Sequence, residues 1–231
     1  MSSVGPAGGP GAGTGSGTGA ARRVPPATVG RLPVYLRALA ALAAQEVAVA
    51  SSRTLAAAAG VASPQVRKDL SFLGSHGRPG VGYDVDHLRR QLTVVLGLTS
   101  QRRVVIVGIG HLGHALANYS GFAGRDFVVV ALVDADPQVV GSTVAGLEVE
   151  PTDRLEAVVA ETAATIAVIA TPAEGAQDVC DRVVAVGVTG VLNFARRSLR
   201  VPPTVDLRVV DLGSELQILA FHDRQKTNLI S

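Results

Sequence analysis

The chain has 231 residues, of which 47% are hydrophobic and 17% are charged, and its formal net charge is +2. This composition is typical of a globular protein with a buried core, and it excludes a fibrous or wholly disordered chain. No apolar run approaches the roughly 20 residues that span a bilayer, and no basic-then-apolar signal opens the chain. We therefore expect a cytoplasmic protein with no membrane partner. The single cysteine, Cys180, excludes an internal disulfide.

The charge is divided unevenly along the chain. Residues 22–100 carry ten Lys and Arg side chains against four acidic ones, whereas residues 101–231 carry eleven against fifteen. A basic region favours a polyanionic partner such as nucleic acid. We therefore expect DNA to bind the first part of the chain.

Helical patterns fill this basic part. Leucines recur at helical spacing over 33–45, and a second, short helix is expected over 54–59. Ser63 before Pro64 predicts the N-cap of a third helix, because a serine cap followed by proline in the first turn favours a helix start. The second and third helices, separated by a short turn, have the dimensions of a helix-turn-helix.

The third helix and the loop after it carry polar side chains suited to DNA. Arginine and lysine pair with guanine edges, glutamine pairs with adenine, and all three contact phosphates. The glycine-rich segment over 74–83 predicts an exposed hairpin, or wing, with a basic tip. An alternative is that these side chains only solvate a surface helix. The candidate DNA-binding residues are Ser63, Gln65, Arg67, Lys68, Ser71 and Arg78.

The most informative segment is a glycine-rich turn between two apolar runs. The first run ends in GIGHLG at 108–113, a helical pattern follows, and the second run stops at Asp134. Gly108 allows a tight turn, Gly110 lets a pyrophosphate approach the backbone, and Gly113 lets the helix pack on the strand. The helix start favours phosphates, and the acid lies where a ribose hydroxyl is bound. This pattern predicts a dinucleotide site, with an unrelated βα turn as the alternative.

Strand-like and helical segments alternate after residue 103, which predicts a parallel sheet with right-handed crossovers. Thr171-Pro172 and Asn193-Phe194 follow two of the strands at their carboxyl ends, where open α/β sheets bind ligands. We expect both segments to line a nicotinamide pocket; ordinary loop termination is the alternative. Strands are expected over 103–108, 127–133, 166–170, 189–193 and 206–211, and helices over 111–121, 152–161, 173–186 and 213–223.

These patterns predict an α/β protein with an N-terminal winged helix-turn-helix. Its Rossmann-type parallel sheet is followed by one C-terminal helix. The expected parts are a disordered tail over 1–21, a winged-helix DNA-binding domain over 22–98, a Rossmann dinucleotide-binding domain over 99–212 and a C-terminal helix over 213–231.

Catalytic chemistry is missing from the pattern. A dehydrogenase needs a substrate domain with an acid/base group, yet only twenty residues follow Asp211. The histidines show no metal-ligand spacing outside the glycine loop, so we expect neither an enzyme nor a metal site. An NAD-dependent oxidoreductase and a CoA-binding Rossmann protein, each with a helical N-terminal extension, remain alternatives. Asp134 disfavours CoA and NADPH, because their ribose phosphates would face its carboxylate.

With these residues in place, the chain resembles the Rex family of bacterial redox-sensing transcriptional repressors over 24–228. The resemblance implies a repressor that binds palindromic operator DNA and is released when NADH binds, so that it senses the NADH/NAD⁺ ratio. It rests on RLPVYLRAL at 31–39, SPQVRKDLSFLG at 63–74, GVGYDVDHL at 80–88, VGIGHLGHALANYSGF at 107–122, VDADPQVVG at 133–141, ATPAEGAQDV at 170–179 and GVLNFARRSL at 190–199.

The same resemblance implies a homodimer whose C-terminal helix is swapped into the partner. A relay of Arg37, Tyr119 and Asp211 is its implied switch. Arg196-Arg197 depart from the proline that usually follows NFA in the family, and Pro79 departs in the wing. The implied NADH- and NAD⁺-binding residues are Gly108, Gly110, His111, Leu112, Gly113, Asp134, Thr171, Pro172, Asn193 and Phe194.

Overall fold

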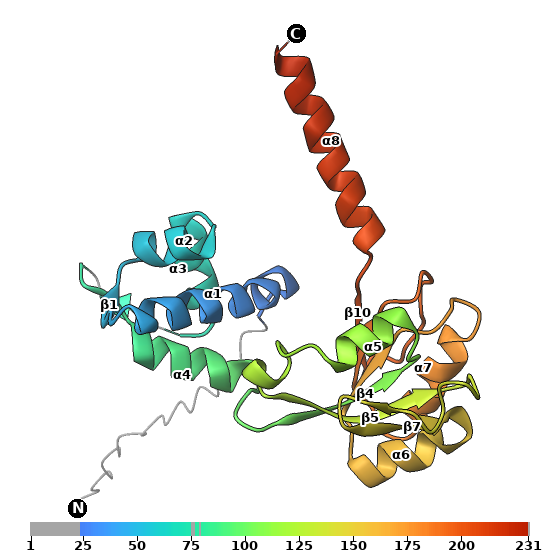
Figure 1. Cartoon of the computed structure of the whole chain (residues 1–231). Coiled ribbons are helices and arrows are strands. Elements are labelled where there is room, and N and C mark those ends of the chain that lie inside the picture. Colours follow the sequence, from blue (N-terminus) through green and yellow to red (C-terminus); the bar gives the residue numbers. More distant parts are fainter. Residues whose placement is uncertain (1–23, 75–76, 79, 231) are drawn as a thin grey trace, which may run out of the picture. The chain divides into compact units, whose positions relative to one another are not determined.

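The computed structural model describes residues 24–74, 77–78 and 80–230, and it divides into two compact units, one up to Leu96 and one from Gly97 (Figure 1). Each unit has a hydrophobic core of its own. The predicted tail over 1–21 lies outside the described residues, as do Ser75, His76 and Pro79 of the predicted wing. Within the described ranges, no helix has the length and apolar character needed to cross a membrane.

The first unit is a helix-turn-helix with a small antiparallel sheet. The strands pair in the order β1-β3-β2, and β2 with β3 forms the hairpin that the glycine-rich segment predicted as a wing. This confirms the predicted winged helix. The elements are α1 (Pro26–Ala44), β1 (Val49–Ala50), α2 (Ser52–Ala59), α3 (Ser63–Ser71), β2 (Gly77–Arg78), β3 (Gly82–Asp84) and α4 (Val85–Val95).

Three helix starts in the first unit differ from the predictions, and α2 begins at Ser52 and not at 54. Helix α1 begins at Pro26 and not at 33, because proline fits a first helical turn and Pro33 is accommodated inside the helix on its exposed side. The predicted serine cap of α3 is also wrong. Ala62 occupies the N-cap, and the Ser63 hydroxyl instead donates to the Ser52 hydroxyl at 3.0 Å. The turn between α2 and α3 is therefore tied by a bond between the two helices.

A buried carboxylate joins α1 to α3. Asp69 of α3 is fully buried, and its oxygens accept hydrogen bonds from the hydroxyls of Thr28 at 2.9 Å and Tyr35 at 2.6 Å. Arg31 donates two further bonds, at 2.6 and 2.8 Å, and Gln65 donates one at 2.9 Å. Burial alone raises the pKa of Asp69, but these bonds lower it well below its usual range. The charged carboxylate thus fixes how α3 lies on α1.

The second unit is a seven-stranded sheet in the order β10-β9-β8-β4-β5-β7-β6, in which only the β6–β7 pair is antiparallel. The predicted Rossmann-type sheet is confirmed, although the β6–β7 hairpin was not predicted. The elements are β4 (Arg102–Val107), α5 (His111–Ala117), η1 (Ala123–Arg125), β5 (Phe127–Asp134), β6 (Thr143–Val144), β7 (Leu147–Pro151), η2 (Thr152–Arg154), α6 (Leu155–Thr162), β8 (Ile166–Ile169), α7 (Ala176–Ala185), β9 (Gly190–Asn193), β10 (Asp206–Val209) and α8 (Leu212–Ile230).

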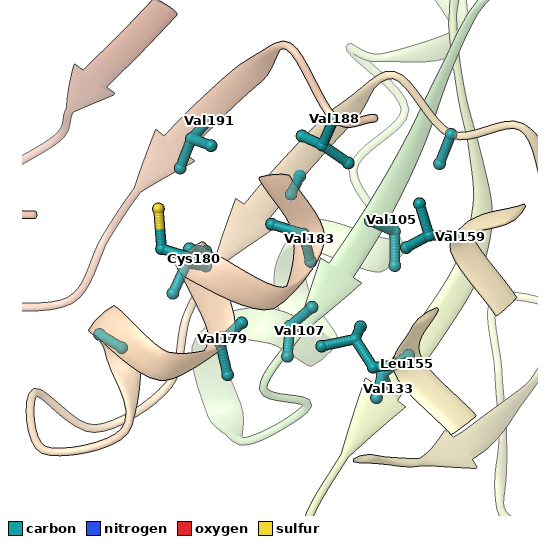
Figure 2. Packing of buried hydrophobic residues seen from close by; sticks show 14 of the residues in the cluster. Val105, Val107, Val133, Leu155, Val159, Val179, Cys180, Val183, Val188 and Val191 are labelled. Atoms are coloured by element: carbon teal, nitrogen blue, oxygen red, sulfur yellow. The ribbon is translucent and has the colours of Figure 1, made fainter. Parts of the chain in front are cut away.

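Helices cover both faces of this sheet. In β4, Val105 and Val107 belong to the cluster formed with α6 and α7, while Val104 and Ile106 belong to the cluster that includes α5. This alternation follows from the two-residue period of a strand. Figure 2 shows the first cluster, in which Cys180 of α7 lies among valines. Burial raises the pKa of its thiol, which disfavours the reactive thiolate.

Helix α8 is longer than the predicted 213–223 and carries no buried side chain between Leu212 and Lys226. Exposed large hydrophobic side chains on one element mark an interaction surface. They are Leu212, Leu216, Ile218, Leu219 and Phe221, each at least half exposed.

We predict that Asp69→Ala destabilises the first unit by about 3–5 kcal/mol, because it leaves the Arg31 guanidinium without its buried partner. Urea unfolding of the full chain in a Tyr119→Phe background, followed by tyrosine fluorescence, measures this, since the two remaining tyrosines, Tyr35 and Tyr83, lie in the first unit and the chain has no tryptophan. Asp86→Ala is the matched control, because its ion pair with Arg89 is exposed and is expected to contribute less than about 1 kcal/mol.

The same cluster predicts an acid sensitivity of the first unit. Because folding lowers the pKa of Asp69, its stabilisation is present above the ordinary carboxyl pKa of about 3.9 and is lost as the pH falls below it. The loss of stability on acidification should therefore be smaller in Asp69→Ala. Equal costs for Asp69→Ala and Asp86→Ala would contradict the account of this cluster.

Candidate functional site

The first candidate site is a cleft between α3 and the wing. It has a volume of about 560 Å³, and its lining includes Arg67 and Ser71 of α3, Arg78 of β2, and Ser52 at the start of α2. Two arginines and two hydroxyls around an open cleft suit the phosphate backbone of a nucleic acid. The helix-turn-helix and the wing therefore bring four polar side chains together at one surface.

Several of the predicted DNA contacts already have partners in the protein. The Gln65 amide donates to Asp69, and the Arg67 guanidinium donates to the hydroxyls of Ser52 and Ser63, each at 3.0 Å. These bonds preorganise the start of α3. The sequence pattern predicted Gln65 as an exposed DNA contact, but its bond to Asp69 restricts the conformation of its side chain. The Ser71 hydroxyl donates to the Lys68 carbonyl within α3 at 2.7 Å.

One basic side chain of α3 and one of the wing remain available. Lys68 and Arg78 are both exposed, and neither side chain has a hydrogen-bond or ion-pair partner within the described ranges. A cation without a protein partner is ready to bind a phosphate or a base edge without breaking an existing bond. These two residues are the strongest candidates for direct contact.

The second candidate site begins at the glycine turn after β4. Gly108 has a φ of +94°, and a Cβ there would lie 2.7 Å from the Ala170 carbonyl carbon. A Cβ at Gly113 would lie 1.8 Å from the Gly108 carbonyl oxygen, so α5 packs on the turn only without a side chain. Gly110 is different, because a Cβ there meets nothing within 4 Å. The open space at Gly110 is where a ligand phosphate approaches in this type of turn.

Asp134 lies at the end of β5, beside the glycine turn. One carboxylate oxygen accepts a hydrogen bond from the Ile109 backbone N–H, and the other accepts one from the Asp136 N–H at 2.8 Å. A carboxylate has about four acceptor positions, so room remains for a hydroxyl donor. The acid is thus held in place by the same turn that would hold a pyrophosphate.

The predicted nicotinamide segments lie at the ends of adjacent strands, but their side chains differ in availability. Thr171 follows β8, and its hydroxyl is buried without a hydrogen-bond partner, whereas Pro172 is exposed. Asn193 is fully buried. Its amide oxygen accepts from the Ala195 N–H and its amide nitrogen donates to the Arg197 carbonyl, so both bonds stay within the loop that follows β9. Phe194 is half-buried against the core on the α5 face.

An unpaired buried hydroxyl, an open phosphate cradle and an acid at the adjacent strand end together fit a dinucleotide. His111 and Leu112, in the first turn of α5, are exposed. Within residues 24–74, 77–78 and 80–230, no group of three His, Cys, Asp or Glu side chains is arranged to hold a metal ion.

The three residues of the expected relay are all exposed. Arg37 lies on α1, two residues beyond the buried Tyr35 and therefore on another face of that helix. Tyr119 follows α5 and meets the Phe122 ring edge-on at 5.2 Å. Asp211 precedes α8 and caps it, accepting from the Gly213 N–H at 3.0 Å. Each side chain is free to meet a further group.

Sequence reasoning missed the cluster around Asp69. A signal was present, because Arg31 and Tyr35 are four residues apart on one helix face and Asp69 is the only acid in α3. The sequence pattern does not, however, predict that the Arg31 and Tyr35 face of α1 packs against the Asp69 face of α3.

Comparison with known proteins gives consistent matches in both units. Residues 23–71 match the family described as "Putative DNA-binding protein N-terminus", and residues 99–196 match "CoA binding domain". The redox-sensing transcriptional repressor Rex of Streptomyces coelicolor is 59% identical over 89% of this chain and 80% of its own length. Its counterpart in Desulfitobacterium hafniense is 43% identical, over 87% and 95%.

Solved structures agree with these matches. The structure of RSP in complex with β-NAD⁺ and operator DNA has a TM-score of 0.84 at 33% identity, covering 90% of this chain and 95% of that one. RSP in complex with β-NADH has a TM-score of 0.80 at 32% identity, covering 89% and 97%.

We predict that Gly110→Ala leaves the fold intact but weakens dinucleotide binding at least about tenfold, because the new methyl group enters the space of a phosphate. Titration of NADH fluorescence measures the binding. Gly113→Ala should instead destabilise the unit, because its methyl group meets the Gly108 carbonyl. Gly124→Ala, which meets nothing within 4 Å, is the control and should bind normally. Unchanged NADH binding by Gly110→Ala would remove the cradle from the account.

Proposed function

Because this chain belongs to the Rex family of redox-sensing transcriptional repressors, we propose that it represses transcription by binding operator DNA and releases the DNA when NADH binds. The observation that carries the proposal is the open cradle at Gly110, joined in one chain to a winged helix. We assign residues 22–98 to DNA binding, 99–212 to the dinucleotide and 213–231 to dimer assembly.

The DNA contacts follow from the availability of the side chains. Lys68 and Arg78 contact DNA directly, Arg67 and Ser71 contact phosphates along the cleft, and Ser63 contacts a phosphate at the start of α3. Gln65 keeps one amide hydrogen for a base edge while the other remains on Asp69. Phosphate contacts make the affinity strongly salt-dependent, and base contacts supply the sequence preference.

The effectors are NADH and NAD⁺, bound without being consumed. Gly108, Gly110 and Gly113, with the His111 and Leu112 backbone, hold the pyrophosphate at the start of α5. Asp134 binds the adenosine ribose and disfavours NADPH, whose 2′-phosphate would face the carboxylate. The nicotinamide lies toward the segments at 171–172 and 193–194. There the Thr171 hydroxyl, which has no hydrogen-bond partner in the protein, can bond to the ligand. A protein with this role acts in the cytoplasm as a sensor and not as an enzyme.

Helix α8 provides the dimer contact. Its exposed apolar side chains, among them Leu216 and Leu219, need a cover that this chain does not supply between Leu212 and Lys226. A second copy that receives α8 and returns its own buries both sets in an isologous exchange. Two recognition helices related by a twofold axis then match a palindromic operator.

The response to NADH is a coupling between two binding sites. NADH releases DNA only to the extent that it binds the DNA-incompetent arrangement more tightly than the competent one. Lowering the competent population from about 99% to about 1% requires a difference of roughly 5.5 kcal/mol. We propose that the relay of Arg37, Tyr119 and Asp211, which the family resemblance implies, transmits this difference.

We predict that Asp211→Ala abolishes NADH-induced DNA release while NADH still binds. Gel shifts with and without NADH, paired with NADH fluorescence titration, separate the two effects. Asp211→Asn repeats the test with the helix cap retained, since asparagine caps helices as well as aspartate does. Ser214→Ala is the control, because it removes a bond to the Asp211 carboxylate at 2.6 Å without removing its charge. Normal NADH sensitivity in both Asp211 variants would exclude the relay.

A further inference from the structure

The strand order gives the candidate dinucleotide site a direction. Asp134 at the end of β5 lies on one side of the glycine turn after β4, and β8, β9 and β10 follow in order on the other side. The turn is close to the loop after β8, since a Cβ at Gly108 would lie 2.7 Å from the Ala170 carbonyl carbon. The Phe194 N–H donates to the Ile169 carbonyl at 2.9 Å and so joins the loop after β9 to the same row. A dinucleotide with its ribose at Asp134 and its pyrophosphate at the turn directs its nicotinamide toward these loops.

Two arginines line a cleft at the far end of this row. The cleft has a volume of about 490 Å³, and its lining includes Phe194, Arg196, Arg197 and Asp211. Both arginines are exposed, and within the described ranges neither guanidinium has a hydrogen-bond or ion-pair partner. Asp211 is the single acid among the described residues that line the cleft. Because a guanidinium stays protonated in proteins, the cleft carries two positive charges against one negative charge.

The backbone that carries the two arginines is held in place. The Asn193 amide nitrogen donates to the Arg197 carbonyl at 2.8 Å, and its oxygen accepts from the Ala195 N–H at 2.9 Å. Further along the loop, the Gln177 amide accepts from the Arg200 N–H at 2.9 Å and donates to the Arg200 carbonyl at 3.0 Å. The loop therefore limits where the two charges lie, although their side chains make no bonds of their own.

Resting on the proposed function, we propose that Arg196 and Arg197 are specificity-determining residues, which favour NADH over NAD⁺ by repelling the positively charged ring of NAD⁺. The nicotinamide ring carries a positive charge in NAD⁺ and none in NADH, and the rest of the two molecules has the same charge. A cleft with a net positive charge beside the ring therefore raises the free energy of bound NAD⁺ more than that of bound NADH. The two arginines discriminate between the redox states by charge alone.

Exposure and one opposing acid limit the size of the effect. The hydrogen bond from Ser214, followed by smaller effects that include the positive charge of Arg196, lowers the pKa of Asp211, so this carboxylate is ionised at neutral pH. Its charge offsets part of the repulsion. Single charges at exposed positions change an equilibrium by about two- to fivefold. Their effect is screened within a Debye length of about 8 Å at physiological ionic strength, so we expect a larger discrimination at low salt.

The test measures binding of three ligands to the full-length protein by isothermal titration calorimetry. They are NADH, NAD⁺ and ADP-ribose, which has the same pyrophosphate and adenosine but no nicotinamide. Arg196→Gln and Arg197→Gln should each tighten NAD⁺ binding about two- to fivefold at low salt, and less at high salt. The Kd values for NADH and ADP-ribose should stay close to those of wild type.

Two control variants separate charge at the cleft from other effects. Arg196→Lys keeps the charge and should bind all three ligands as wild type does. Arg200→Gln removes a charge from an exposed position of the same loop, outside the residues that line the cleft, and should not change the ratio of the NAD⁺ Kd to the NADH Kd.

The outcomes distinguish this inference from the proposed function. An unchanged ratio in both glutamine variants, or an equal fall of the ratio in Arg200→Gln, would overturn the inference. Weaker binding of all three ligands by the glutamine variants would also overturn it, because the arginines would then hold the pyrophosphate. In each of these cases, NADH-induced release of DNA by the wild-type protein would still support the proposed function. A wild-type protein that binds neither dinucleotide would overturn both.

Discussion

The buried carboxylate of Asp69 is the constraint on which the DNA-binding surface depends. A charge without solvent is tolerable only when it is paired and hydrogen-bonded, and here four side chains from two helices supply those bonds. The requirement fixes α3 on α1 more narrowly than apolar packing does, because hydrogen bonds are directional. Helix α1 also carries Arg37 on its exposed side. A displacement of α1 therefore carries the recognition helix with it as one body.

In the second unit, close backbone contacts fix the candidate site, whereas in the first unit a buried charge fixes the recognition helix. Gly108 and Gly113 bring strand, turn and helix together at distances that exclude any side chain, and the space left at Gly110 is shaped for a phosphate. Asp134 is held by the backbone of the same turn. Binding and selectivity are therefore built into one short segment. Under the proposed function, this rigid scaffold holds the dinucleotide, and the redox state is sensed at the nicotinamide end.

The sequence predicted features with local signals and missed those that depend on distant partners. The turn at 108–113 and the parallel sheet follow from glycine chemistry and strand alternation, and both were predicted. The hairpin β6–β7 was missed because its strands are short and mix polar with apolar residues. Gln65 was predicted to be an exposed DNA contact and Ser63 to be an N-cap, but their side chains bond to Asp69 and Ser52. The start of α1 was misplaced because the prediction followed the leucines at 36, 39 and 42, whereas the helix begins at Pro26.

The central claim is that DNA occupancy reports the redox state of a bound nicotinamide dinucleotide. The most direct measurement is a gel shift at fixed salt, on a palindromic duplex selected from random sequence by the protein itself. The duplex is titrated in parallel with NADH, NAD⁺ and NADPH. The account predicts that NADH releases the duplex, while NAD⁺ and NADPH leave it bound over the same concentration range. Release by NADPH as effective as by NADH, or no release by NADH, would contradict it.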